Sequence, residues 1–279
     1  MKTSVAWLLL ILWVTTACTP TVSNKAQDLL DSAISHYSNA QYATAKLLID
    51  SIQTQFPKQI DIRKKAHALM YYIEQQEVKR NIAYLDSVMP IMYAQWDSVA
   101  TQFRMPASDT LYISEYLYKH KTFQKQSPAT GLYCEINDEG DMYLISVYTG
   151  RVLDHTQVTV SCGDIYAQTQ EVPLNHVSNY QFTDLGVRWE YITFGMQNQN
   201  DVLGFIATYA NEPLTVTLHG KRTYRYTLPA KTAKAMAQSV QFAKQTAILY
   251  QLKKSYQLST DKLLWLEQKI QASDSLLVL

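Results

Sequence analysis

The chain has 279 residues and is 47% hydrophobic, so it can bury a sizeable core and fold as one large domain or two smaller ones. Its 25 basic and 24 acidic residues give a net charge of +1, and no basic run alternates with aromatic residues. This pattern gives no support for a nucleic-acid-binding groove, so no nucleic-acid partner is expected. The 20 tyrosines indicate either a strand-rich exported protein or a binding surface.

The N-terminus has the pattern of an export signal. Lys2 is followed by an apolar run from Val5 to Val14, which would form a helix of about 15 Å, whereas a bilayer core requires about 20 apolar residues. This short length predicts a signal peptide over residues 1–17 rather than a membrane-spanning helix.

Small residues then lead into a cysteine. Thr15, Thr16 and Ala17 before Cys18 resemble the lipobox of bacterial lipoproteins, in the relaxed form typical of Bacteroidetes, because Thr15 replaces the usual leucine. The resemblance implies that Cys18 is lipidated and that several acyl chains anchor the mature protein to a membrane. The alternative is an ordinary secretory signal in which Cys18 is incidental.

The residues after Cys18 indicate in which membrane the protein would be anchored. Residues 18–24 are predicted to be a polar tether, and the stretch from Thr19 to Lys25 contains no acidic residue. Surface-exported Bacteroidetes lipoproteins carry an acidic cluster at this place. The resemblance therefore implies the outer membrane, with the protein facing the periplasm.

Residues 25–125 are predicted to form a helical region. Apolar residues spaced by three and four indicate a helix from Lys25, a break at Ser38–Gln41 and a second helix that ends at Pro57. Residues 111–123 fit either a short helix or an edge element.

The first helical hairpin, residues 25–57, has a small residue, an aromatic residue and a proline at characteristic positions. Ala33, Tyr42, Ala45 and Pro57 stand at spacings that resemble one tetratricopeptide repeat. The resemblance extends to lipoproteins of outer-membrane assembly machines, in which a lipid anchor precedes such repeats. The alternative is a generic helical hairpin.

The clearest period lies in residues 82–103. Apolar side chains recur at alternating spacings of three and four, which predicts a coiled-coil-like seam that packs on another helix. Pro90 interrupts the seam and predicts a kink or a new helix start near Met89. The seam consists of Ile82, Leu85, Met89, Met92, Trp96, Val99 and Phe103.

Residues 130–228 are predicted to form an antiparallel β-module. Segments that alternate, or that are rich in β-branched and aromatic residues, recur about every 8–12 residues without helices between them. The oxygen-rich stretch Asn137–Asp141 predicts a hairpin turn. The predicted strands are Leu132–Ile136, Met142–Tyr148, Gln157–Ser161, Ile165–Gln170, Trp189–Phe194, Val202–Tyr209, Leu214–Leu218 and Arg222–Leu228.

Residues 229–279 are predicted to form C-terminal helices, the last of them capped by Ser259, Thr260 or Asp261. Each of these helices has an apolar stripe along one face. These stripes are long enough to pack against the seam at residues 82–103. The expected fold is therefore α+β, with N- and C-terminal helices packing as a stalk around an inserted antiparallel β-sandwich-like module. The stripes consist of Ala235, Phe242, Leu249 and Tyr256, and of Leu263, Leu266, Ile270 and Leu277.

The sequence carries no recognisable catalytic or metal-binding constellation. There is no glycine-rich phosphate loop, and no two of the six histidines stand three or four residues apart. We therefore expect no enzymatic activity, no metal and no cofactor. Cys134 and Cys162 lie in predicted strands and either form a disulfide or remain two free thiols.

One carboxylate lies in a strongly apolar strand. Glu190 stands between Trp189 and Tyr191, where it is either a general acid or a ligand-contacting group beside aromatic rings, or a solvent-facing position of an alternating strand. No second carboxylate is placed near it by spacing, so glycosidase chemistry is not supported.

These patterns favour a non-enzymatic, lipid-anchored scaffold or adaptor of the cell envelope that has a protein partner. The alternative is a lipoprotein that binds a glycan or a peptide through its Tyr- and Trp-rich β-module, and an enzyme with a site assembled across the fold is a third hypothesis. Exposed coplanar Tyr and Trp rings would favour the binding module, and a pocket with perturbed carboxylates would favour the enzyme.

Overall fold

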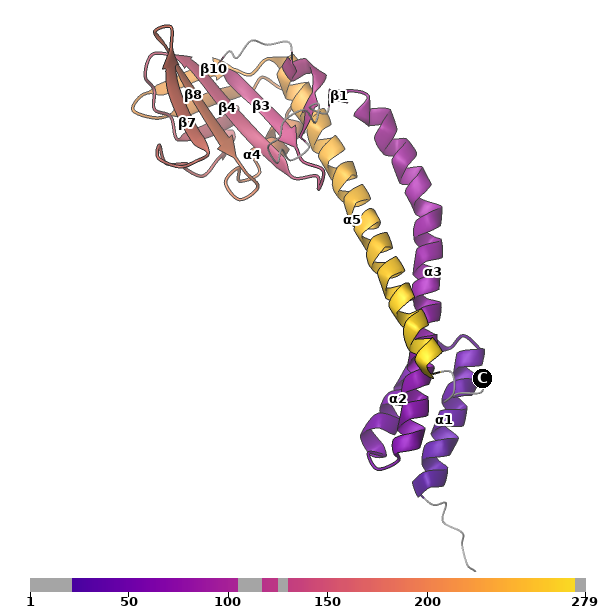
Figure 1. Cartoon of the computed structure of the whole chain (residues 1–279). Coiled ribbons are helices and arrows are strands. Elements are labelled where there is room, and N and C mark those ends of the chain that lie inside the picture. The colour runs from indigo at the N-terminus through magenta and orange to yellow at the C-terminus, as the bar shows by residue number, and fades with distance from the viewer. Residues whose placement is uncertain (1–21, 105–116, 125–129, 274–279) are drawn as a thin grey trace, which may run out of the picture. The chain divides into compact units, whose positions relative to one another are not determined.

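The computed structural model describes residues 22–104, 117–124 and 130–273 (Figure 1). This part of the chain forms two compact units, one made of residues 22–81 and 259–273 and the other of residues 82–258. The predicted signal peptide and Cys18 lie outside the described residues, as does Leu277 of the last stripe. Within the described ranges, no helix is both long and apolar enough to cross a membrane.

The first unit is helical. It contains α1 (Val22–Ser38), α2 (Tyr42–Gln55) and the beginning of α3 (Ile60–Ala100). The predicted hairpin is present, although α1 includes residues 22–24, which were predicted to belong to the tether. Ala33 and Ala45 are fully buried, and such small side chains allow helices to approach closely.

The end of α5 (Ala230–Ser273) belongs to the same unit and packs on the beginning of α3. Trp265 lies edge-to-face on Tyr71 with ring centroids 5.8 Å apart. Asn81 Nδ2 donates a hydrogen bond to Ser259 Oγ at 2.8 Å. Segments before and after the β-module therefore contact each other in this unit, at residues that precede the predicted seam.

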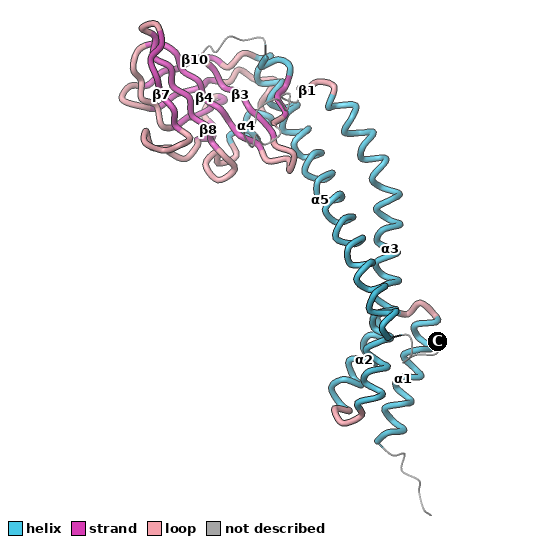
Figure 2. Tube along the Cα trace, in the orientation of Figure 1, coloured by secondary structure: helices cyan, strands magenta, loops and turns pink. Residues whose placement is uncertain are grey.

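The second unit contains two antiparallel sheets (Figures 1 and 2). Sheet A has the order β1-β2-β3-β4-β8-β7, and sheet B has the order β10-β9-β5-β6. The strands of sheet A are β1 (Phe103–Arg104), β2 (Tyr118–His120), β3 (Gly131–Ile136), β4 (Met142–Gly150), β8 (Val187–Phe194) and β7 (Asn179–Asp184). Those of sheet B are β10 (Thr223–Thr227), β9 (Thr215–His219), β5 (Gln157–Cys162) and β6 (Ile165–Gln168).

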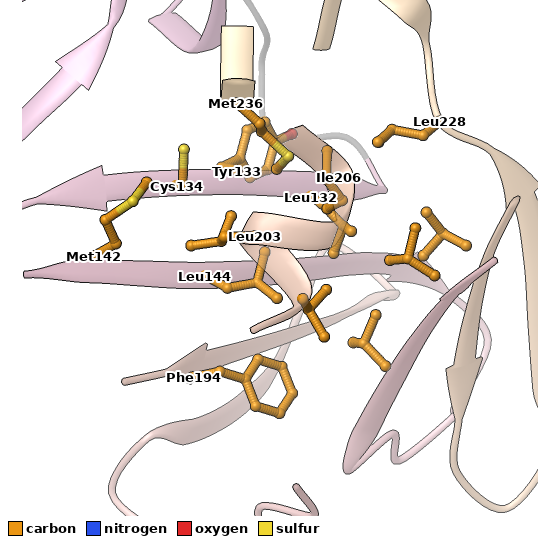
Figure 3. Close-up of a cluster of buried hydrophobic side chains, with 14 of the residues drawn as sticks. Leu132, Tyr133, Cys134, Met142, Leu144, Phe194, Leu203, Ile206, Leu228 and Met236 are labelled. Atoms are coloured by element: carbon orange, nitrogen blue, oxygen red, sulfur yellow. The ribbon is translucent and has the colours of Figure 1, made fainter. Parts of the chain in front are cut away.

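The two sheets share one core with helices α4 (Val202–Thr208) and α5. Because side chains alternate along a strand, Leu132 and Cys134 of β3 point inward with Leu144 of β4. Figure 3 shows these side chains beside Leu203 of α4 and Met236 of α5. Sheet B contributes Val158, Val160, Val216 and Leu218. A helix-flanked β-module with a sandwich-like core is thus present.

Within this second unit, α3 contacts α5 at Trp96 of the predicted seam. Trp96 Nε1 donates a hydrogen bond to Thr246 Oγ1 at 2.9 Å, and its ring lies 5.4 Å from that of Phe242. Phe103 stacks on Phe242 with ring centroids 4.1 Å apart. This arrangement confirms that helical segments before and after the β-module pack together.

Three helix predictions need correction. Phe103 lies in β1 rather than in the seam helix. Helix α3 continues through Pro90, which excludes a new helix start near Met89 and leaves a kink as the remaining alternative. Likewise, α5 is one helix through residues 259–261. The expected cap residue Ser259 instead uses its hydroxyl to accept the bond from Asn81.

Two short segments of the β-module also differ from prediction. Val202–Tyr209 was predicted to be a strand but forms α4, because the buried Val202, Leu203 and Ile206 lie on one helical face. A short apolar run fits both the helical period of 3.6 residues and the strand period of two. Strand β7, in contrast, was missed although its aromatic and polar residues alternate, because only two of its six residues are aromatic. The short strand β1 falls in the segment predicted to be helical. Strand β2 lies within residues 111–123, for which a short helix and an edge element were both left open, and residues 111–116 lie outside the described part of the chain.

Both cysteines of the β-module are free thiols, which is the second of the two alternatives. Cys134 lies in β3 of sheet A, whereas Cys162 lies at the end of β5 in sheet B and is partly exposed. Burial raises the pKa of the Cys134 thiol to about 12, so this side chain behaves as a small apolar group.

Candidate functional site

Strand β8 separates the predicted site residues onto two faces of sheet A. Glu190, Ile192 and Phe194 point into the core and are fully buried. Trp189 and Tyr191 alternate with them and point outward, where both are half-buried. The three neighbouring positions Trp189, Glu190 and Tyr191 therefore do not form one site.

The outer side of β7 and β8 carries parallel aromatic rings. Phe182 of β7 lies opposite Trp189, with ring centroids 6.0 Å apart and planes within 6°. Tyr191 lies 6.1 Å from Phe182, with planes within 8°. Tyr180, opposite Tyr191, extends the row and is 63% exposed. We call Tyr180, Phe182, Trp189 and Tyr191 the aromatic face.

A hollow of about 380 Å³ adjoins the aromatic face at Tyr191. Ile145 and Val147 of β4 line it with apolar atoms. At its border, Lys119 Nζ forms an ion pair with Glu135 Oε1 at 2.7 Å. The remaining lining residues are Phe123, Tyr133 and Thr193. The hollow thus combines an apolar lining with one charged pair.

The aromatic face ends at an open sheet edge. In the described part of the chain, β7 pairs with β8 alone, so its other side is an edge of sheet A. Large apolar side chains are exposed around this edge, with Val177 at 94% and Leu185 at 96%. Single exposed apolar residues are ordinary on protein surfaces, but an open sheet edge can accept a further strand.

Glu190 holds the segment that links β4 to β5. Its Oε1 accepts hydrogen bonds from the backbone N–H groups of Leu153 and Asp154, at 2.8 and 2.7 Å. Its Oε2 accepts from the backbone N–H of His155 at 2.9 Å and contacts His155 Nδ1 at 2.7 Å. Both carboxylate oxygens are therefore occupied inside the protein.

This environment corrects both interpretations of Glu190. The side chain is fully buried, so it neither faces solvent nor reaches a ligand beside Trp189 and Tyr191. Burial alone would raise the pKa of the Glu190 carboxyl, but the bonds from the His155 ring and the backbone lower it to about 2. A carboxyl that stays ionised at neutral pH does not serve as a general acid.

Sequence reasoning identified Trp189 and Tyr191 but missed Tyr180 and Phe182, which complete the aromatic face. The signal was present in β7, where aromatic and polar residues alternate with period two. No family model matches the chain, and no curated protein or solved structure is significantly similar to it.

Proposed function

We propose that this protein is a non-enzymatic adaptor of the bacterial cell envelope that binds a partner protein through the aromatic face of sheet A. The observation that carries the proposal is the row of parallel rings formed by Phe182, Trp189 and Tyr191 beside an open sheet edge. Parallel, partly exposed Trp and Tyr rings are the feature expected of a module that binds a glycan or a peptide, and the proposal combines peptide binding at this face with the role of an envelope adaptor.

The chemistry of this face suits a protein partner better than a sugar. Trp and Tyr are enriched among the residues that contribute most to protein interfaces, whereas charged residues are depleted at interface centres. The hollow beside Tyr191 has room for an anchoring side chain of the partner. The Lys119–Glu135 ion pair at the border of the hollow can bond to a polar group of the partner and so fix the partner's orientation.

In this proposal the lipid on Cys18 supplies the membrane attachment. Several acyl chains hold a protein stably on a bilayer without a spanning helix. The absence of acidic residues from Thr19 to Lys25 supports the inner leaflet of the outer membrane. The adaptor then presents its β-module to the periplasm, where its partner is another envelope protein.

Site-specific photocrosslinking in living cells tests the aromatic face. A benzoylphenylalanine replaces Tyr180, which is 63% exposed, and a matched control replaces Tyr84 of α3, which is 59% exposed. We expect a discrete adduct from position 180 that position 84 does not give. The partner, identified from the adduct and purified, should bind the wild-type protein and lose affinity for a Phe182→Ser variant.

Two outcomes would contradict the proposal. In the native host, position 180 would give no adduct, or it would give the same adducts as position 84. In either case the aromatic face is not a protein-binding surface.

A further inference from the structure

A second concave surface lies in the same unit as the β-module but on different elements. A groove of about 850 Å³ runs between α4, strand β6 and the beginning of β5. It is lined mainly by amide and hydroxyl side chains, together with three aromatic rings. We propose that this groove binds a neutral oligosaccharide, which goes beyond the protein-binding function proposed above.

The amide groups of the groove are held in fixed orientations. Gln168 Nε2 donates to Gln157 Oε1 at 2.8 Å, and Gln157 Nε2 donates to the Thr169 carbonyl at 2.9 Å. Asn200 Nδ2 donates to the Gln168 carbonyl at 3.0 Å. Among the described residues, these bonds leave Gln168 Oε1 and Asn200 Oδ1 to accept bonds from a ligand. A preorganised polar site binds with less loss of side-chain entropy.

Aromatic rings border the polar groups. Tyr166 of β6 is 65% exposed, and Phe205 and Tyr209 of α4 lie with ring centroids 4.8 Å apart. Sugar rings present C–H groups on their faces and hydroxyls at their edges. A groove that offers both ring faces and planar amides matches this distribution, since polar groups fix orientation while apolar walls exclude water.

The charge of the groove excludes other ligand classes. Asp201 is the one charged side chain in its lining, and no lysine, arginine or histidine belongs to that lining. Phosphate and carboxylate ligands are held by cationic groups, so nucleotides and acidic sugars do not fit. A single carboxylate, in contrast, accepts hydrogen bonds from neighbouring sugar hydroxyls.

Asn200 and Asp201 contribute two polar side chains to the groove at the start of α4. Both residues adopt the left-handed region, with φ of 46° and 57°. Asn and Asp adopt this region more readily than other non-glycine residues, because their short polar side chains can bond locally.

Isothermal titration calorimetry on the mature, lipidated protein in detergent micelles tests the inference. The probes are triacetylchitotriose, maltotriose, cellotriose and mannotriose. We expect one of them to bind, and we expect Tyr166→Ala and Asp201→Asn to weaken its affinity by about ten-fold or more. Both side chains are exposed, so these variants should keep the stability of the wild-type protein.

The matched control is Tyr180→Ala on the aromatic face, where the tyrosine is equally exposed. It should leave oligosaccharide affinity unchanged, and Tyr166→Ala should leave the crosslink from position 180 unchanged. These two controls separate a wrong assignment of the groove from a wrong assignment of the protein-binding face. If none of the four probes binds at millimolar concentration, or if Tyr180→Ala abolishes binding instead of Tyr166→Ala, the inference is overturned.

Discussion

Glu190 contacts the ring nitrogen Nδ1 of His155 at 2.7 Å, and both side chains are fully buried. Glu190 belongs to β8 of sheet A, whereas His155 lies in the segment that leads to β5 of sheet B. The other ring nitrogen of His155 lies 3.0 Å from Ser146 Oγ of β4. These bonds hold the crossing between the two sheets, so we expect them to matter for folding rather than for catalysis.

Replacing Glu190 with glutamine should destabilise the protein. Glutamine has the same shape as glutamate but no charge. Its amide N–H groups would face the backbone N–H donors of residues 153–155 and could not bond to them. We therefore expect the free energy of unfolding to fall by about 3 kcal/mol at neutral pH. Urea unfolding followed by circular dichroism measures the change. Glu212→Gln is the control, because Glu212 is exposed and should change stability by less than about 0.5 kcal/mol.

The pH dependence of stability should have the same origin. The pKa of Glu190 is lowered from 4.5 to about 2 in the folded protein, so its stabilising effect is present above pH 4.5 and is lost as pH falls toward 2. The wild-type protein should lose about 3 kcal/mol from this group across that window. Glu190→Gln should show a flatter profile there, and an unchanged profile would contradict the role assigned to Glu190.

Gly140 in the β3–β4 turn should be irreplaceable because α5 passes directly beside it. A Cβ at Gly140 would lie 2.5 Å from the Ala247 nitrogen and 2.6 Å from the Ala243 oxygen, both backbone atoms of α5. Gly140 also has φ of 89°. We expect Gly140→Ala to cost about 2–4 kcal/mol in thermal unfolding experiments, from the conformation and the clash together.

Gly186 provides the matched control for Gly140. Its φ of 79° is similar, but a Cβ there would meet no atom within 4 Å. Gly186→Ala should therefore cost about 1 kcal/mol, from the backbone conformation alone. Equal losses in the two variants would show that the contact between the turn and α5 contributes nothing.

Strong periodicity made most of the fold predictable. The heptad spacing around Trp96 identified the face that meets α5, and alternation located β3, β4, β5, β6, β8, β9 and β10. The helix α4 was missed because Val202–Thr208 is short and apolar enough to satisfy either period. Local pattern therefore identified long elements better than short ones.

The candidate site was only half predictable, since its composition depends on strand pairing. Trp189 and Tyr191 were identified from one strand, but Phe182 joins them only through the register of β7 with β8. The burial of Glu190 depends in turn on the loop at Leu153–His155, which lies far away in the sequence. Spacing along one strand contains no information about such partners.

Metabolic labelling tests the proposal that Cys18 carries a lipid anchor. Cells grown with an alkyne fatty acid should label the wild-type protein, because the resemblance to a lipobox implies that the Cys18 thiol receives the first lipid. Cys18→Ala should abolish the label and release the protein from the membrane fraction. Equal labelling of both proteins would contradict lipidation at this residue.

The orientation at the membrane should be periplasmic. Protease added to intact cells should leave the protein uncut, because at the proposed location, the inner leaflet of the outer membrane, that membrane would shield it. Permeabilised cells are the control, and in them the same protease should digest it. Digestion in intact cells would place the protein on the cell surface instead.

Trp96 should stabilise the monomer, because it joins α3 to α5 within one chain. Its indole N–H bonds to Thr246 Oγ1, and its ring packs against Phe242 and Tyr118. Trp96→Phe removes the hydrogen bond and part of the ring packing and should cost about 1–2 kcal/mol, while the Thr246 hydroxyl keeps its bond to the Phe242 carbonyl. Trp96→Asp places a charge among these rings and should cost about 3 kcal/mol.

Urea unfolding combined with sedimentation velocity distinguishes this role of Trp96 from a rival one. If the seam from Ile82 to Val99 instead joined two copies of the chain as a coiled coil, Trp96→Asp would convert a dimer into a stable monomer. The contacts of Trp96 with α5 lead us to expect the opposite result. The wild-type protein should sediment as a monomer, and Trp96→Asp should lower its unfolding midpoint without changing its mass.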